Sequence, residues 1–471
     1  MKPDFDFIAR ETEYVETAHR CIKTPIPVPE SFPLFQEMEK YEIHANMGQP
    51  PVVWHHTEDG YKICDPYGNK WIDFSSAIFI TNAGHGNPDI VDAIVKTAQK
   101  PMLASFLFAT EERVEAAREY ISVCPIPDAK VYMLSAGTEA CEMALKVMRV
   151  NGVMKNPKKK VIVTMKDSFH GRTLGSQQLG GSAALSAWIT SMDPDIIHAP
   201  YPTSFEHKWA DPEDPDFTED GMFKSFTDTI DAAGVDYDDI CGVFIESYHA
   251  PLCYPLPTSY AKRLRKFCDE HDIILGMDEI QIGGCRSGKF WCFMNNDIIP
   301  DLFTSAKGSS SSLPQSCLFG RRALLDVFEA QGLTSTHSGS PVCCAASAAN
   351  IRFLRDNKMW EVAAEKGKII DRRLHEIKAK YPDRVAYVGG IGMGWSIHFA
   401  NARKEPQPEF TREVLLRSME MGLLFSAPNN HGASLRCMAP LTIPVEALEE
   451  GLDVFDAAIG KADKMMPKYT D

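Results

Sequence analysis

Short apolar segments alternate with amphipathic ones through most of this chain, from about residue 88 to residue 340. Stretches such as 111–123 and 260–271 carry apolar residues at the spacing of one helix face. The predicted strands are 130–134, 160–164, 240–245, 272–277, 302–305 and 315–319. Strands that alternate with helices form a mostly parallel sheet covered on both faces. The sequence therefore predicts an α/β fold whose ligand-binding residues follow the carboxyl ends of the strands.

The chain, at 471 residues, is long enough for about two or three domains. We expect residues 1–80 to form an N-terminal arm followed by a short ribbon, residues 81–345 to form the large domain, and residues 346–471 to form a C-terminal α/β domain. The ribbon is predicted to be antiparallel, with strands at 52–54 and 61–65.

Composition narrows the classes of function. The formal net charge of −15 argues against nucleic acid or an anionic membrane as a partner. No apolar run reaches the ~18 residues of a membrane span, and the charged N-terminus does not resemble a secretory signal. The 13 cysteines include no C-x-x-C pair, which is typical of reduced cytosolic thiols. The sequence contains neither H-E-x-x-H nor paired Cys/His spacing, so we expect no metal. The other features predict a soluble, cytoplasmic protein.

The stretch 304–314 places a single lysine, Lys307, among residues with very small side chains. Small neighbours allow a flat ligand and the backbone to approach each other closely. A lysine in a partly dry site loses proton affinity and becomes an amine nucleophile. Taken alone, however, the stretch is more typical of a surface lysine in a flexible Ser/Gly linker.

An acidic stretch that begins at Asp278 changes this interpretation. Asp278 follows the apolar run 273–277, so it is predicted to end a buried strand, about thirty residues before Lys307. Such a pair indicates a site for pyridoxal phosphate, in which the lysine forms an imine and the carboxylate keeps the pyridine nitrogen protonated.

Two further pairs of residues follow predicted strands, and each pair has two interpretations. Gly137 and Thr138 open the helix after strand 130–134. Their N–H groups and hydroxyl suit a phosphate, but they would equally form an ordinary helix cap. Phe169 would stack on a flat cofactor beside His170, or both residues would belong to the core.

Four polar side chains complete the candidate set. Glu246 ends strand 240–245 as a second buried carboxylate, and Gln281 would reach a ring hydroxyl of the cofactor. Thr336, in a loop of small residues, would donate to a phosphate or belong to a flexible turn. Arg436 lies in an apolar setting, where it would bind a substrate carboxylate or form an internal salt bridge.

In their order along the chain, these motifs resemble those of the class III (omega) aminotransferases. The matching motifs are Ser-Ala-Gly-Thr-Glu-Ala at 135–140, Phe-His-Gly-Arg-Thr at 169–173, Glu246, Asp-Glu-Ile-Gln at 278–281, Ala-Lys-Gly at 306–308, Ser-Thr-x-x-Gly-x-Pro at 335–341 and Leu-Arg-x-x-x-Pro-Leu at 435–441. The resemblance covers about 50–460. It implies a fold-type I pyridoxal phosphate enzyme, with a large sheet domain and a smaller α/β domain from the N- and C-terminal segments.

The resemblance also implies roles for individual residues. The residues that it assigns to the cofactor are Gly137, Thr138, Phe169, His170, Glu246, Asp278, Gln281, Lys307 and Thr336. Among these, Lys307 would be the Schiff-base lysine, Asp278 would pair with the pyridine nitrogen, and Thr336 would reach the phosphate of the neighbouring subunit. Family members are homodimers with both active sites at the interface, so we expect a homodimer.

Three departures from the family pattern concern the substrate more than the cofactor. Pro251 stands where members often carry a second glutamate that shields the substrate arginine, which would leave Arg436 open to a carboxylate. Serines 309–312 replace a glycine run after the lysine, and Ser340 replaces the usual asparagine of Gly-Asn-Pro.

The resulting prediction is an aminotransferase that moves an amino group between an amino acid or amine and a 2-oxo acid. The alternative is an amino-acid racemase or epimerase, because 174–177 and 341–343 resemble racemases of the same group. A non-catalytic relative would be expected to have lost Lys307 or Asp278, and both are present.

Overall fold

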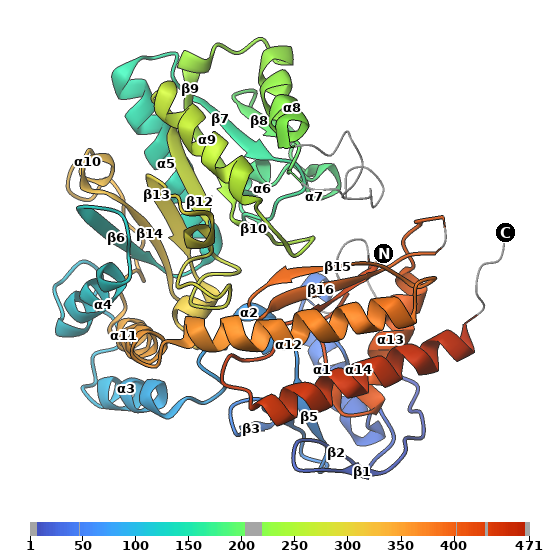
Figure 1. The fold of residues 1–471 in the computed structure, drawn as a ribbon. Helices are drawn as coiled ribbons and strands as arrows, with labels where there is room; N and C mark the ends of the chain where they lie inside the picture. Colours follow the sequence, from blue (N-terminus) through green and yellow to red (C-terminus); the bar gives the residue numbers. More distant parts are fainter. Residues whose placement is uncertain (1–6, 47, 203–218, 402, 429–431, 467–471) are drawn as a thin grey trace. The chain divides into compact units, whose positions relative to one another are not determined.

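The computed structural model describes residues 7–46, 48–202, 219–401, 403–428 and 432–466 (Figure 1). The chain forms two compact units. The first, called here the large unit, is Pro88–Glu361, and the second, called the small unit, combines Met1–Asn87 with Val362–Asp471.

The large unit is built on a sheet of seven strands among its described residues, in the order β6-β14-β13-β12-β9-β7-β8. The strands are β6 Ala129–Leu134, β7 Val161–Met165, β8 Ile196–Ala199, β9 Ile240–Glu246, β12 Ile274–Asp278, β13 Leu302–Ser305 and β14 Ser316–Arg321. Only β14 runs antiparallel to its neighbours, and the other pairs are parallel. The mostly parallel sheet predicted from the sequence is therefore confirmed.

Helices cover both faces of this sheet, so the central strands are buried along their whole length. The helices are α3 Pro88–Ala98, α4 Glu111–Ser122, α5 Gly137–Lys155, α6 Leu174–Leu179, α7 Ala183–Ser186, α8 Glu219–Ala232, α9 Thr258–Glu270, α10 Arg322–Leu325 and α11 Pro341–Asp356. Because crossovers between parallel strands are right-handed, α5 and α6 lie on one face and α8 and α9 on the other (Figure 1). A small hairpin, β10 Tyr248–His249 and β11 Tyr254–Pro255, follows β9.

In the small unit, the two ends of the chain share one sheet. Its strands are β1 Val15–Glu16, β2 Cys21–Ile22, β3 His56–Glu58, β4 Lys62–Cys64, β5 Lys70–Asp73 and β17 Leu423–Leu424, with β17 from the C-terminal segment pairing parallel to β5. A second sheet consists of β15 Val385–Ile391, β16 Gly394–Phe399 and β18 Ser434–Cys437. The helices are α1 Phe32–Tyr41, α2 Ser76–Phe79, α12 Met359–Lys380, α13 Pro408–Glu420 and α14 Val445–Met465.

Some local predictions were wrong. No strand forms at 52–54, and the outer strand of the ribbon is β3 at 56–58, because the tight turn at Asp59–Gly60 pairs Glu58 with Lys62. The sequence also gave no prediction of β8 or α8.

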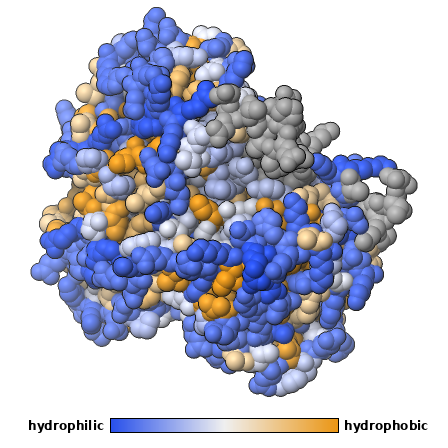
Figure 2. Space-filling model, viewed as in Figure 1, coloured by the Kyte–Doolittle hydropathy of each residue, from blue (hydrophilic) through white to orange (hydrophobic). Residues whose placement is uncertain are grey.

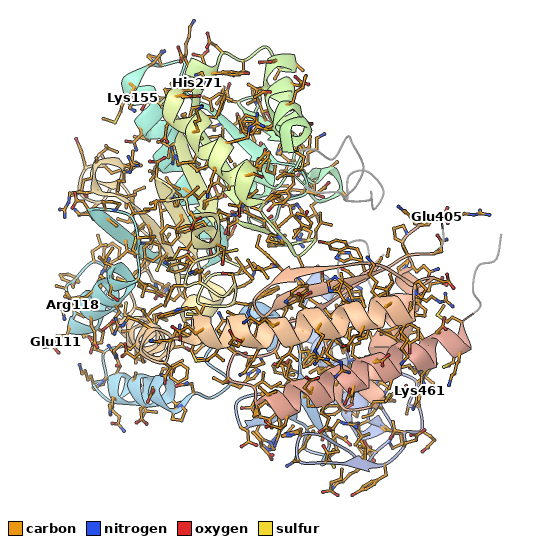
Figure 3. The ribbon with its side chains drawn as sticks, viewed as in Figure 1. Glu111, Arg118, Lys155, His271, Glu405 and Lys461 are labelled. Carbon is orange, nitrogen blue, oxygen red and sulfur yellow. The ribbon has the colours of Figure 1, made fainter. Side chains whose placement is uncertain are left out.

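The surface is largely hydrophilic on the face that Figure 2 shows. Charged side chains such as Glu111 and Lys155 project outward from their helices into the solvent (Figure 3). Within the described ranges, no helix combines the length and the apolar character needed to cross a membrane.

Candidate active site

Three polar residues stand in a row at the carboxyl ends of β9, β12 and β13. Asp278, the last residue of β12, pairs in register with Glu246 on one side and with Thr304 on the other. Lys307 follows Thr304 in the loop after β13. The sheet edge that ordinarily binds ligands in α/β folds therefore carries two carboxyl groups and, just beyond them, the predicted lysine.

Four donors surround the Asp278 carboxylate. Its Oδ2 atom accepts from His170 Nδ1 at 2.7 Å and from the Cys141 thiol at 3.3 Å. Its Oδ1 atom accepts from the Ile280 N–H at 2.9 Å and from the Thr304 hydroxyl at 3.0 Å. Asp278 is buried, so these donors replace water in stabilising its negative charge.

The two neighbouring carboxyl groups have opposite pKa shifts. Burial disfavours the charge of Asp278, but the hydrogen bond and the charge interaction with His170, together with the other donors, hold its pKa below the usual value. Burial and the adjacent negative charge of Asp278 raise the pKa of Glu246 well above its usual range, which the positive charge of Lys307 offsets only in part. Burial, hydrogen bonding and neighbouring charge thus shift the two pKa values in opposite directions, which favours a charge on Asp278 and disfavours one on Glu246.

Glu246 fixes the backbone at two positions. Its Oε2 atom accepts the Phe169 N–H at 3.2 Å, and its Oε1 atom accepts the Ala250 N–H at 3.1 Å. Gln281 donates its side-chain N–H to the Ala250 carbonyl at 3.2 Å. The loop that departs from the family pattern is therefore tied on both sides to predicted site residues.

Lys307 lies in a firmly held loop. It is half-buried and has a φ of 43°, a left-handed value that costs a non-glycine residue about 1–2 kcal/mol. The Asn350 side chain donates to the carbonyls of Gly308 at 2.9 Å and Ser309 at 2.8 Å. Residues 308–311 are buried. The flexible-linker interpretation of this stretch is thus wrong, and strained backbone held in this way is typical of functional sites.

The N-terminus of α5 lies against the same row. A Cβ atom at Gly137 would lie 3.1 Å from the Ile280 side chain and 3.6 Å from Ala306 Cβ, so glycine allows the close approach of these segments. The Thr138 hydroxyl hydrogen-bonds the hydroxyls of Thr173 and Ser176, each at 2.7 Å. The first N–H groups of α5 therefore lie beside the segments that carry Asp278 and Lys307.

The loop that contains Thr336 lies next to this helix end. Ser335 donates to the Glu139 side chain in the first turn of α5 at 3.3 Å, while Thr336 is exposed. Phe169 is also partly exposed, at 37%, with the Arg172 guanidinium 5.4 Å from its ring centroid. An aromatic ring left open beside buried polar groups provides a surface on which a flat ligand would stack.

Arg436 belongs to the small unit, where it lies on β18 in register with Ser396. Its guanidinium carbon is 5.6 Å from the Phe79 ring centroid, and its buried Nε atom has no hydrogen-bond partner among the described residues. No described carboxylate forms an ion pair with Arg436, so the internal salt bridge is not found in the part of the chain that the structure describes.

The turn that carries Phe79 was missed by the sequence reasoning. Residues 76–79 all have positive φ values, from 48° to 65°. The turn is anchored by the Asp73 carboxylate, which accepts the N–H groups of Ser75 at 2.7 Å and Ser76 at 3.1 Å and is paired with His85 Nε2 at 2.7 Å. None of the four is glycine, so residue type gave no signal.

Cys141 and Thr304 were missed as well. The contact of Thr304 follows from strand pairing, since it stands opposite Asp278 in β13. Cys141 approaches Asp278 from α5, and that contact depends on how the helix is rotated over the sheet.

These residues fit pyridoxal phosphate. An ionised buried carboxylate suits a protonated ring nitrogen, an exposed ring suits its flat face, and helix N–H groups suit its phosphate. His170 adds a buried Nε2 atom without a hydrogen-bond partner among the described residues. Lys307, a half-buried residue, stands beside this set.

Comparisons with known proteins agree with this geometry. A family model described as Aminotransferase class-III matches residues 43–459. The chain is 30% identical to 2-aminoadipate transaminase of Pseudomonas putida over 87% of its length and 96% of that protein, and 29% identical to mitochondrial acetylornithine aminotransferase of Saccharomyces cerevisiae over 84% and 88%. It is 26% identical to alanine/serine racemase of Pyrococcus horikoshii over 84% and 83%.

Among solved structures, a transaminase from the marine bacterium Virgibacillus superimposes with a TM-score of 0.82 at 23% identity, over 92% of this chain and all of that one. Fold and site together define a fold-type I enzyme that depends on pyridoxal phosphate. With a family match over most of its length, the chain belongs to the class III aminotransferases.

Proposed function

We propose that Lys307 and Asp278 carry the aminotransferase reaction of this enzyme, and that Arg436 binds a carboxylate of its substrate. The observation on which this rests is the row of Glu246, Asp278 and Thr304 at the carboxyl edge of the sheet, with Lys307 directly after it. When bound, pyridoxal phosphate supplies a ring that withdraws electrons from the substrate carbon.

Each protein group has a distinct part in this proposal. Asp278, kept ionised by its four donors, holds a proton on the ring nitrogen. Lys307 holds the cofactor through Nζ, and the same amine accepts the proton from the substrate α-carbon once the substrate has taken its place. Phe169 stacks on the ring, Gln281 contacts the ring hydroxyl, and His170 positions Asp278.

The phosphate is assigned to the N-terminus of α5. The N–H groups of Gly137 and Thr138 point out of the first turn of that helix, where the helix dipole favours an anion. Glu246 is buried and its pKa is raised, which disfavours a second negative charge in the site. It instead positions the Phe169 ring and the loop at Ala250 through their N–H groups.

The runner-up function is amino-acid racemisation, which is supported by the 26% identity to an alanine/serine racemase. A racemase returns the proton to the substrate α-carbon, whereas an aminotransferase passes the amino group to a 2-oxo acid. The two therefore differ in whether a second substrate is needed.

We further propose a homodimer. The segment after α3 leaves a run of apolar side chains exposed in the single chain, from 37% to 79%: Met102, Leu103, Phe106, Leu107 and Phe108. An apolar surface of this kind marks an interaction site. The exposed Thr336 would then serve the phosphate of the partner subunit.

We also propose that the enzyme is cytoplasmic. All 13 cysteines are free thiols, and 11 of them are buried. Free buried thiols are typical of a reducing compartment.

Lys307→Ala should abolish turnover and the absorbance of the lysine-bound cofactor, because it removes the amine that is proposed to bind the cofactor and to accept the proton. The wild-type enzyme, incubated with single amino acids, should turn over repeatedly only when a 2-oxo acid is added to take up the amino group. Chiral chromatography of reactions with and without the oxo acid measures both turnover and any inversion of the amino acid. Inversion of an amino acid without oxo acid would instead identify a racemase, and turnover by the alanine variant would refute the role of Lys307.

Cys141→Ser should weaken cofactor binding by about two- to tenfold, because a hydroxyl is a stronger donor than a thiol and competes for Asp278 Oδ2. Cys141→Ala removes the donor and should bind the cofactor like the wild type. Titration of the apoenzyme, followed by absorbance, measures both constants. Equal loss in the two variants would mean that Cys141 acts through packing and not through its hydrogen bond.

Arg436→Met should raise KM for carboxylate substrates by about ten- to hundredfold, because the substrate loses a hydrogen-bonded contact to a charged group. For amine donors that carry no carboxylate, KM for the donor should not change. The exposed Arg118 on α4 (Figure 3) supplies the control Arg118→Met. Equal KM changes for amines and amino acids would contradict the assignment.

Phe108→Asp should shift the enzyme from dimer to monomer and weaken cofactor binding, because it places a charge in the apolar run. Light scattering coupled to size exclusion measures the mass. Met154→Asp, at an apolar residue of comparable exposure on α5, is the control and should remain dimeric. A monomeric wild-type enzyme with full activity would refute the proposed assembly.

A further inference from the structure

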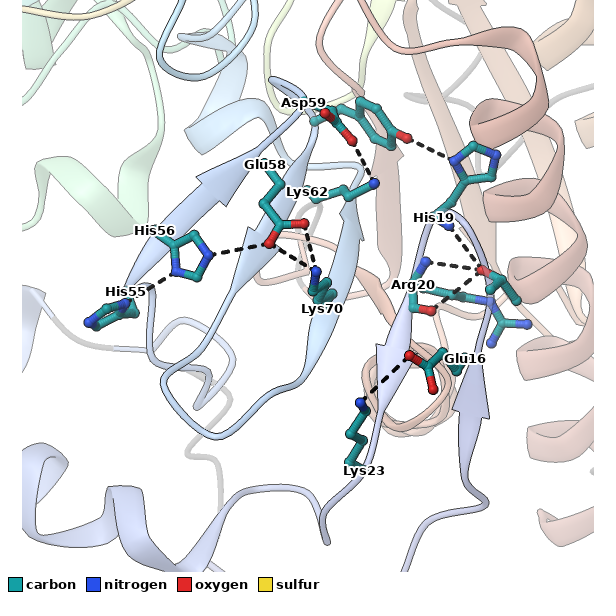
Figure 4. Close-up of polar contacts among 12 residues, drawn as sticks. Glu16, His19, Arg20, Lys23, His55, His56, Glu58, Asp59, Lys62 and Lys70 are labelled. Atoms are coloured by element: carbon teal, nitrogen blue, oxygen red, sulfur yellow. Dashed lines mark hydrogen bonds and ion pairs between the residues drawn. The ribbon is translucent and has the colours of Figure 1, made fainter.

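Three side chains that bind metals in proteins meet on one face of the β3–β4 hairpin in the small unit. Strand pairing sets His56 directly opposite Cys64. Glu58 lies two residues after His56 on the same strand, so its side chain points to the same face. Figure 4 shows His56 and Glu58 side by side along β3. The pairing of the strands, and no sequence motif, brings the three together.

The distances between these groups suit one ion. One ligand atom from each of His56, Glu58 and Cys64 lies within 4.8 Å of the other two. Tetrahedral Zn²⁺, with bonds of about 2.1–2.3 Å, brings nitrogen, oxygen and sulfur ligands to about 3.6 Å from one another. Side-chain movements of about 1 Å would therefore form a coordination shell without moving the strands.

A neighbouring imidazole orients the histidine. His55 Nδ1 lies 3.2 Å from His56 Nδ1, so one of the two nitrogens donates to the other. His56 Nε2 then faces the carboxylate, 3.5 Å from Glu58 Oε1 (Figure 4). A partner on the outer nitrogen of a histidine is the usual device that fixes its ring towards a metal.

We propose that His56, Glu58 and Cys64 form a zinc site, with water in the fourth position. A set of one thiol, one imidazole and one carboxylate favours Zn²⁺ over Mg²⁺ or Ca²⁺, which select oxygen ligands. On binding, the Cys64 thiol gives its proton to solvent and the thiolate coordinates the ion. The half-exposed His56 side chain gives solvent access, while Cys64 is 1% exposed and places its sulfur on the inner side.

Lys70 is the one obstacle that the contacts of Glu58 reveal. Its Nζ atom lies 2.9 Å and 2.7 Å from the two carboxylate oxygens, so it neutralises Glu58 when no ion is present. The Lys70 side chain is 39% exposed, and its flexible stem allows the ammonium to turn into water. Zinc and Lys70 thus compete for the Glu58 carboxylate, so removing the Lys70 ammonium should strengthen Zn²⁺ binding.

The site would fasten an edge of the sheet. β3 ends the strand order β1-β2-β5-β4-β3 among the described residues and pairs with β4 alone. An ion that joins β3 to β4 through side chains stabilises the edge strand in addition to its backbone bonds. Because an ion that binds only the folded state stabilises it, Zn²⁺ should raise Tm.

The test uses the full-length, untagged enzyme loaded with its cofactor. Competition with a chromogenic chelator should find one tightly bound Zn²⁺ per chain, and Co²⁺ should give a thiolate charge-transfer band. Cys64→Ser should remove that band. Cys64→Ser and His56→Gln should each weaken Zn²⁺ binding more than about tenfold, because the loss of a partner outside the coordination shell already weakens metal binding by about that factor. Lys70→Met should strengthen binding.

Cys21→Ser is the matched control, because Cys21 is another buried thiol of the same sheet, on β2 next to Lys70. It should leave the Co²⁺ band and the Zn²⁺ affinity unchanged. The proposal is overturned if the wild type binds no stoichiometric Zn²⁺, if Cys64→Ser keeps the thiolate band, or if Lys70→Met binds no more tightly. Since His56→Gln changes a half-exposed side chain, its effect does not depend on whether the Cys64 variant folds well.

Discussion

The ionised carboxylate of Asp278 is the interaction on which the active-site architecture depends. A charge buried without partners costs several kcal/mol, and here four donors offset that cost. They come from β13, from α5, from the loop after β7 and from the second residue after β12 itself. Aligning them requires the parallel strands to end in one line, so the site needs the whole sheet and not only the two motifs that mark it.

The raised pKa of Glu246 is a consequence of burial and of the same charge. Two carboxyl groups side by side in a dry site do not both ionise, and the one with more donors keeps the charge. Glu246 also accepts backbone N–H groups from Phe169 and Ala250, and these hydrogen bonds partly offset the rise of its pKa. Gln281 holds the Ala250 carbonyl from the other side. These contacts explain how the loop through Pro251 is held without the second glutamate that many family members carry there.

The sequence predicted what depends on residue type and order. Continuous apolar runs predicted the central strands, and a carboxylate and a lysine after two of them indicated the cofactor. It failed where three-dimensional context decides. Cys141 reaches Asp278 only because of how α5 is rotated, and the left-handed turn at 76–79 contains no glycine. The ribbon strand predicted at 52–54 was displaced because a tight turn, and not hydrophobicity, sets its register.

The two cationic side chains singled out by the sequence are held in different ways, and the difference bears on specificity. Lys307 is fixed by its backbone, with a strained φ and neighbouring carbonyls bound by Asn350. Arg436 is placed by strand pairing and faces an aromatic ring, with no acidic partner among the described residues. A guanidinium in that setting gains most from a planar anion that accepts two hydrogen bonds. Under the proposed function, substrate choice therefore depends on Arg436, which has no acidic partner in the described part of the chain, as much as on the lysine proposed to hold the cofactor.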